Sequence, residues 1–194
     1  MQKAAQIFLT CFILCSCKTI LTLSMIEKQA DSIIIEDVAF IKLGTYRGFT
    51  DAGVEYQKTF FLQRYSSAPW AESKAICKAF DLDLVSFETL VESRAFLNML
   101  DTNSALRTLA SISIWSDGIT LSSIGSTTDW YWSKTGKKIS FPIDWLPNQP
   151  NGNNDQQYCM CIARHDFSST LKFNDCFCYG AYRIACQRTQ FFLS

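Results

Sequence analysis

The pattern of hydrophobic and polar positions begins with a short apolar segment. A mostly apolar run without charged residues covers residues 4–17, follows the basic Lys3 and ends at Lys18. A basic start before about 7 to 15 apolar residues is typical of a secretory signal, and the run is shorter than the ~20 residues that a membrane-spanning helix needs. We therefore predict a cleaved signal peptide over residues 1–24 and no membrane span in the mature chain.

Helical patterns follow between residues 69 and 100. A helix is expected to begin at Pro69, because the missing N–H of proline would be unpaired in the first turn anyway. Its apolar residues recur with a roughly helical period, which predicts that Cys77 faces the core. Thr89 and Glu92 form a T-x-x-E capping box, which predicts a second helix to about Leu100.

The remaining pattern is one of strands and loops. Residues 33–43 and 58–64 are apolar, strand-like runs, and from Ile112 onward Trp, Tyr, Thr, Ser and Gly replace helix formers. The tryptophans of this later part are expected to pack in the core. Residues 140–157 are rich in Pro and Asn and have no apolar period, which predicts a long ordered surface loop. Long loops of compact domains are often functional.

Composition indicates one globular domain and excludes several functions. The chain has 194 residues, of which 48% are hydrophobic, with only 8 Gly and 4 Pro, which excludes collagen-like and disordered classes. Its 18 basic residues balance 18 acidic ones, so there is no basic field for nucleic acid, and loss of the signal makes the chain mildly acidic. His165 and Asp166 lie near a predicted turn without a nucleophile in a known motif, so no enzymatic activity is predicted.

Six cysteines remain after the signal is removed, and an even number in an exported chain indicates disulfides. A zinc site is disfavoured because His165 is the only histidine. Opposed residues of an antiparallel strand pair have position numbers with a constant sum, and Cys159 with Cys178 has the same sum as Cys161 with Cys176. We therefore predict these two bridges across a hairpin that turns between residues 168 and 169. The remaining pair, Cys77 with Cys186, would join the first helix to the last strand.

Several motifs occur in one order along the mature chain. They are W-x6-C at Trp70–Cys77, L-x-L-V-S at Leu82–Ser86, W-S-D-G from Trp115, W-x-P-x-Q-P-N at Trp145–Asn151, and then Cys159, Asn174-Asp175, Cys178 and Cys186. From about Leu43 to Arg188 the chain resembles a C-type lectin-like domain, in the short form of secreted invertebrate lectins. In that family the bridges correspond to Cys77–Cys186 and Cys159–Cys178, so Cys161 and Cys176 are additional.

The resemblance implies an α+β fold with two helices, small antiparallel sheets and a long ligand loop, stapled by disulfides. It divides the chain into the signal peptide, an N-terminal extension over residues 25–43, the C-type lectin-like domain over 44–188 and a tail over 189–194. It also implies a secreted, extracellular protein.

In sugar-binding members of the family, the loop and a neighbouring strand hold Ca²⁺, which then binds two sugar hydroxyls. Ca²⁺ takes six to eight oxygen ligands, and side-chain oxygens supply several of them. Carried over by position, the sugar- and calcium-binding residues are Gln149, Asn151, Gln157, Asn174 and Asp175. Pro150 is expected to follow a cis peptide bond.

This ligand set departs from that of mannose-binding members, because amides replace two of three carboxylates and only Asp175 is acidic. Fewer acidic ligands weaken the attraction for a divalent cation, so we expect a weak calcium site, which Asp155 could supplement. The triplet Gln149 to Asn151 also mixes mannose-type and galactose-type patterns, so the sequence assigns no sugar preference.

Two functions are compatible with the resemblance. The first is a carbohydrate-binding lectin that recognises glycans or glycoproteins through Ca²⁺, and the second is a domain that binds a protein surface without calcium. The amides at Gln149 and Gln157 favour the second function. The first function is favoured by the retained Pro150, Asn151, Asn174 and Asp175, and we adopt it as the prediction.

Overall fold

A computed structural model of the chain describes residues 39–107, 112–121, 129–152, 157–164, 166 and 169–192. Residues 40–194 form a compact unit that holds the elements described below. The predicted signal peptide, most of the predicted N-terminal extension, and residues Asp155 and His165 lie outside the described residues.

The described part of the chain contains helices and strands in mixed order. They are β1 (Phe40–Phe49), β2 (Glu55–Ala68), α2 (Trp70–Ala79), β3 (Asp83–Leu84), α3 (Leu90–Thr102), α4 (Ser104–Arg107), β4 (Ile112–Thr120), β5 (Trp130–Trp132), β6 (Cys159–Arg164), β7 (Lys172–Cys176) and β8 (Tyr182–Phe192).

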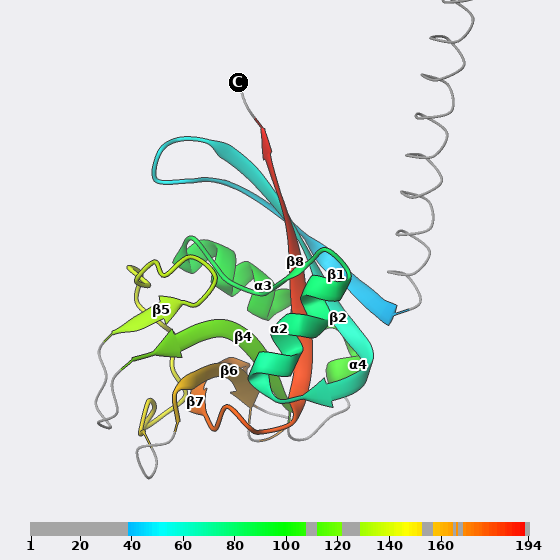
Figure 1. Cartoon of the computed structure of the whole chain (residues 1–194), viewed down its shortest axis with the longest axis vertical. Helices are drawn as coiled ribbons and strands as arrows, with labels where there is room; N and C mark the ends of the chain where they lie inside the picture. Colours follow the sequence, from blue (N-terminus) through cyan, green and yellow to red (C-terminus); the bar gives the residue numbers. More distant parts are fainter. Residues whose placement is uncertain are drawn as a thin grey trace, which may run out of the picture. The chain divides into compact units, whose positions relative to one another are not determined.

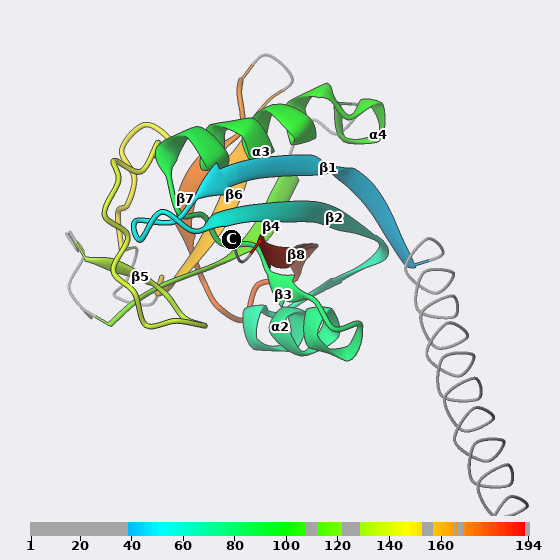
Figure 2. The ribbon, with the colours of Figure 1, turned by 90° about the horizontal axis from the view of Figure 1, so that it is seen from above.

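One sheet connects the strands in the order β1-β2-β8-β4-β6-β7, with β3 paired to β8 and β5 paired to β4. The pairs are antiparallel except β4 with β8, which are parallel. The early strand β2 and the late strand β8 therefore lie side by side (Figure 1). Seen from above, β2 and β8 lie between α3 and α2 (Figure 2).

Both helices begin where the sequence predicts. Pro69 immediately precedes α2, and the buried Cys77 of this helix faces the core. At α3, the Thr89 hydroxyl accepts a hydrogen bond from the N–H of Glu92 at 3.1 Å, which satisfies one of the free donors of the first turn. The predicted α+β class is confirmed.

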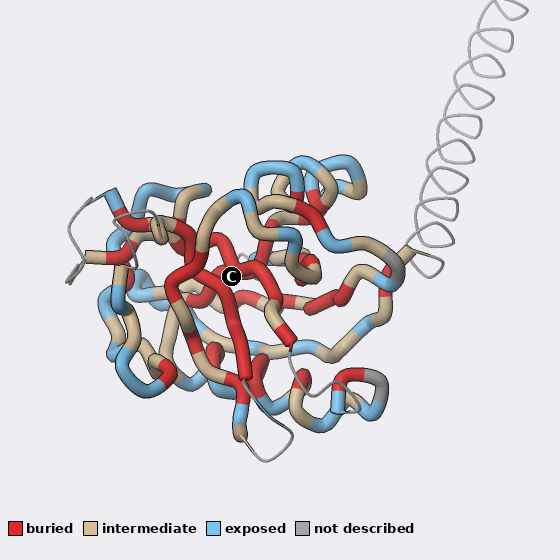
Figure 3. Tube along the Cα trace, turned by 90° about the horizontal axis from the view of Figure 1, so that it is seen from below, coloured by how far each residue is buried: buried red, intermediate tan, exposed pale blue. Residues whose placement is uncertain are grey.

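The core is built from strand and helix side chains of the whole domain. Buried residues form continuous stretches through its interior, and exposed residues lie around them (Figure 3). Trp115, Trp130 and Trp132 are buried, and Trp145 packs on Trp130 with ring centroids 5.1 Å apart. The tryptophans are therefore core residues, as the sequence predicts.

The sheet extends beyond both predicted domain limits of 44–188. At the start, β1 pairs with β2 from Phe40, and at the end β8 pairs with β2 as far as Phe192, opposite Glu55. Residues 189–192 are thus part of a strand and not of a tail. The physical reason is the length of β2, which satisfies the backbone groups of both neighbouring strands.

The disulfides join Cys77 to Cys186, Cys159 to Cys178 and Cys161 to Cys176, which are the pairs expected from the sequence. The predicted register of the hairpin is wrong by two residues, however, because Cys159 lies opposite Cys176 and Cys161 lies opposite Asn174. The bridges run diagonally, and β7 ends before Cys178. Their Cα–Cα distances of 5.2 and 6.0 Å are still within the range that a disulfide spans.

Candidate functional site

The long loop is attached to β7 directly before the predicted ligands of that strand. Leu146 donates its N–H to the carbonyl of Phe173 at 2.8 Å, and Phe173 donates to the carbonyl of Asp144 at 3.0 Å. The loop therefore runs beside β7 (Figure 1). This attachment fixes the loop next to Asn174, the residue after Phe173.

The loop residues expected to bind a ligand form a tight turn. The peptide bond between Gln149 and Pro150 is cis, as predicted. The side-chain oxygen of Gln149 accepts a hydrogen bond from the N–H of Asn151 at 3.1 Å. Its oxygen is thus directed at the backbone of its own loop.

Asp175 connects the loop with β7. Its side chain is buried, with an exposed fraction of 1%, and Oδ2 accepts a hydrogen bond from the N–H of Gly152 at 2.6 Å. Gly152 has a φ of 57°, a left-handed conformation that glycine adopts without strain. The second oxygen, Oδ1, is buried and has no hydrogen-bond partner among the described residues.

Asn174 has a similar unpartnered oxygen. Its Oδ1 is buried without a donor in the part of the chain that the structure describes, while its Nδ2 donates to the sulfur of Cys176 at 3.4 Å. A buried acceptor without a partner costs about 1–3 kcal/mol, and more if it is charged. Two adjacent side chains of β7 therefore present oxygens that a cation or a ligand donor would stabilise.

The predicted ligand residues come from three segments that are connected through β7. The bond from Gly152 to Asp175 brings the segment with Gln149 and Asn151 to β7. Gln157 lies two residues before β6, which pairs with β7 through Met160 opposite Asp175.

The predicted ligand residues match a weak cation site in the type of their atoms but not in their charge. Side-chain oxygens are the right ligand type for Ca²⁺, and the two unpartnered oxygens of Asn174 and Asp175 favour a bound cation. No cluster of three or more acidic, histidine or cysteine side chains suited to a metal occurs among the described residues. A cation at this position would therefore depend on Asp175 as its acidic ligand.

Sequence reasoning missed the backbone N–H of Gly152, which holds Asp175. A main-chain donor leaves no trace in a side-chain pattern, and the Asn- and Gly-rich composition of the loop indicates only a turn there.

None of the described helices has the length and hydrophobicity needed to span a bilayer.

Comparison with known proteins identifies the fold. No family model and no curated protein sequence matches the chain. The C-type lectin domain of murine dendritic cell inhibitory receptor 2, solved in complex with an N-glycan, superimposes with a TM-score of 0.52 at 20% identity over 69% of this chain and 91% of that one.

Two further structures agree with this likeness. The carbohydrate-recognition domain of mouse scavenger receptor C-type lectin gives a TM-score of 0.51 at 15% identity, over 80% of this chain and 98% of that one. The corresponding domain of cow CD23, solved in the presence of a GlcNAc2Man3 oligosaccharide, gives 0.50 at 19% identity, over 69% and 88%. The chain has the C-type lectin fold, with the α+β architecture expected from the sequence.

Proposed function

We propose that this chain is a secreted, extracellular, non-enzymatic C-type lectin that binds glycans or glycoproteins at the long loop and β7, with the help of a weakly held Ca²⁺. The observation that carries the proposal is the pair of buried, unpartnered oxygens on Asn174 and Asp175. Gln149, Asn151 and Gln157 would complete the oxygen set.

The chemistry of the site explains why the cation would be weakly held. A buried carboxylate attracts a hard cation, but one acidic ligand gives less attraction than three. Sites of low ligand charge bind Ca²⁺ with dissociation constants near 10⁻⁴ to 10⁻³ M, which extracellular calcium can still fill. When bound, the ion supplies additional coordination positions for sugar hydroxyls, and the loop residues orient the sugar.

Fold neighbours support the choice of ligand. The murine receptor domain was solved with an N-glycan and the cow CD23 domain with an oligosaccharide. At identities of 20% and 19% these structures establish the fold, and glycan binding by this chain is our proposal from its own residues.

Asp175→Asn tests this proposal. The asparagine can still accept from Gly152, so we expect a stability without calcium equal to or above that of the unchanged protein. We also expect it to lose the rise in melting temperature with added Ca²⁺ and to bind glycans at least about tenfold more weakly. The measurements are thermal unfolding during a Ca²⁺ titration and a glycan array read with and without EDTA.

Asp81→Asn is the matched control, because Asp81 is exposed and its φ of 55° is tolerated by asparagine. It should behave as the unchanged protein in both measurements. If chelation changes neither the melting temperature nor glycan retention by the unchanged protein, the calcium-dependent proposal is wrong.

Calcium-independent protein binding is the second candidate, and one observation favours it. Gln149 Oε1 and Asp175 Oδ2 already accept backbone N–H groups of the loop, so the turn is held without a metal. This candidate requires a protein ligand whose binding survives both EDTA and enzymatic removal of its glycans. Loss of binding on deglycosylation would favour the lectin.

A further inference from the structure

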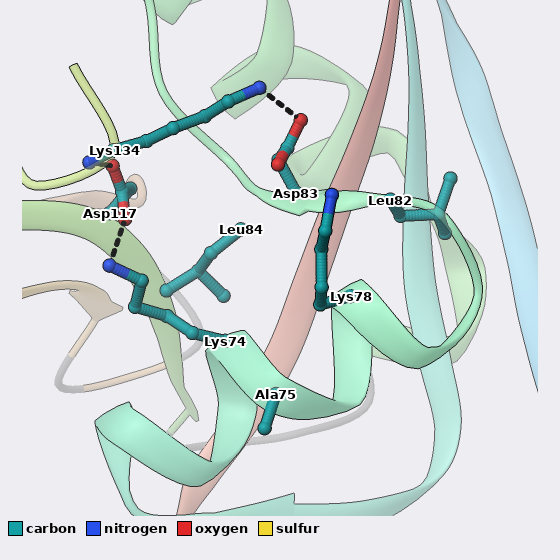
Figure 4. Close-up of a pocket in the computed structure, with 8 residues that line it drawn as sticks. All are labelled: Lys74, Ala75, Lys78, Leu82, Asp83, Leu84, Asp117 and Lys134. Atoms are coloured by element: carbon teal, nitrogen blue, oxygen red, sulfur yellow. Dashed lines mark hydrogen bonds and ion pairs between the residues drawn. The ribbon is translucent and has the colours of Figure 1, made fainter.

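A second concave site lies between α2, β3 and the turn after β5 (Figure 4). It has a volume of about 380 Å³ and is lined by Lys74, Ala75, Lys78, Leu82, Asp83, Leu84, Asp117 and Lys134. It shares no residue with the site proposed on the long loop. Its volume is at the lower end for small-molecule sites, which suits a ligand of about one ring.

Three lysines from two segments border this cavity. Lys74 and Lys78 lie four residues apart on one face of α2, and Lys134 follows β5. Figure 4 shows the ammonium groups of Lys78 and Lys134 directed toward the same side of the cavity, near Asp83. Each ammonium has three N–H donors, so one ion pair leaves donors for a ligand.

The two aspartates of the cavity are already engaged by donors of the protein. Asp117 is buried, lies 3.4 Å from the Lys74 ammonium, and accepts hydrogen bonds from the Ser133 hydroxyl at 2.7 Å and the Lys134 N–H at 2.8 Å. Asp83 forms an ion pair with the Lys134 ammonium. Their charges are therefore compensated before a ligand binds.

Lys78 is the lysine without such a partner. It is exposed, and its ammonium has no hydrogen bond or ion pair within the described part of the chain. Three lysines against two aspartates leave one uncompensated positive charge at this cavity. Leu84 and the aliphatic stems of the lysines form an apolar wall beside it, which matches an anionic ligand with an apolar face.

We propose that this cavity binds the sulfate or carboxylate group of an acidic monosaccharide unit, with Lys78 as the principal anion-binding residue and Lys134 as its neighbour. The charges and shape of the cavity support the binding of an anionic group. That this group is carried by a saccharide rests on the proposed glycan-binding function. A free inorganic anion is the other source of the same chemistry. Binding here needs no metal, which distinguishes this site from the one on the loop.

Calorimetric titrations of the whole mature protein in EDTA test the proposal. The probes are glucose 6-sulfate, glucuronate, glucose and inorganic sulfate. We expect glucose 6-sulfate or glucuronate to bind more tightly than inorganic sulfate, glucose not to bind, and Lys78→Ala to weaken binding about fivefold to tenfold. Added salt should weaken binding as well, because the site is open to solvent.

Lys42→Ala is the control, since Lys42 is an exposed lysine of β1 that does not line the cavity. It should leave the affinity unchanged, and melting temperatures should confirm that both variants fold. No binding of either acidic sugar, equal binding of glucose, or equal affinity in Lys78→Ala overturns the proposal. Equal affinity for inorganic sulfate and glucose 6-sulfate would show that the sugar ring adds nothing to binding, which overturns the proposal that the anion belongs to a saccharide. Because every titration contains EDTA, failure of the calcium site leaves these results unaffected.

Discussion

At the scale of single residues, Tyr56, Lys58 and Glu92 form a buried polar group where β2 meets the start of α3. The Lys58 ammonium lies 2.8 Å from Glu92 Oε1, and the Tyr56 hydroxyl donates to Glu92 Oε2 at 2.8 Å. Lys58 is 2% exposed and Glu92 is fully buried. Removing one partner of a buried ion pair leaves an uncompensated charge and costs about 3–5 kcal/mol. This buried group therefore stabilises the contact between β2 and α3 only when all three side chains are present.

Tyr56→Phe is predicted to change the pH dependence of stability. Burial, and then the Glu92 carboxylate, raise the pKa of the Tyr56 hydroxyl far above its ordinary value of 10.0. In the unfolded chain it would ionise near that ordinary value. The raised pKa therefore stabilises the fold fully below about pH 9, and this stabilisation is lost as the pH rises above about 10.

We expect Tyr56→Phe to be about 1–3 kcal/mol less stable at pH 8, with the gap to the unchanged protein narrowing by up to ~1.4 kcal/mol for each pH unit above 10. Urea unfolding between pH 8 and 10.5 measures both quantities. Tyr182, whose pKa burial also raises, is present in both proteins, so the difference isolates Tyr56. Parallel stability curves across this range would contradict the argument.

At the scale of elements, the start of α3 is predicted by the local sequence, whereas the contacts of its Glu92 are not. Thr89 and Glu92 predict the helix start correctly, and Thr89 makes the expected capping bond. Glu92 does not complete the capping box, because its Oε2 accepts from the N–H of Glu88 and from Tyr56. A capping motif describes groups within one turn, whereas Tyr56 is 36 positions away in sequence.

Thr89→Ala and Glu92→Gln are therefore predicted to differ although they alter one motif. Loss of the cap should cost about 1 kcal/mol. Loss of the Glu92 charge leaves the buried Lys58 ammonium with only the Glu88 carboxylate, 3.7 Å away, and should cost about 3 kcal/mol. Chemical denaturation at pH 7 compares them. Thr102→Ala, at the exposed end of the same helix, is the control and should change stability by less than about 0.5 kcal/mol. Equal losses in Thr89→Ala and Glu92→Gln would contradict the assigned role of Glu92.

The hairpin of β6 and β7 and the candidate site show the same limit of sequence reasoning. The spacing of the cysteines predicts the correct bridges with the wrong register, because a disulfide spans diagonal as well as direct neighbours of a strand pair. The motifs likewise select Asn174 and Asp175, while the bond from Gly152 depends on how the loop packs. Residue types and spacings are local properties, and register and main-chain donors are set by the assembled sheet.

At the scale of the whole molecule, Cys77–Cys186 joins α2 to β8, which pairs with β2, β3 and β4. It spans 109 positions, whereas Cys161–Cys176 spans 15 and lies inside the 19 positions closed by Cys159–Cys178. Chain-entropy arguments give a closed loop of about a hundred residues 4–5 kcal/mol of stabilisation. A bridge nested inside another restricts the unfolded chain much less.

Double replacement of each pair by alanine separates loop closure from packing. All four cysteines of the two pairs are at most 3% exposed, so both variants lose similar buried contacts. We expect Cys77→Ala/Cys186→Ala to lose at least about 2 kcal/mol more than Cys161→Ala/Cys176→Ala in urea unfolding at pH 7. Equal losses would mean that the packing of the sulfur atoms dominates, and then the additional inner bridge would stabilise the domain as much as the bridge that joins α2 to β8.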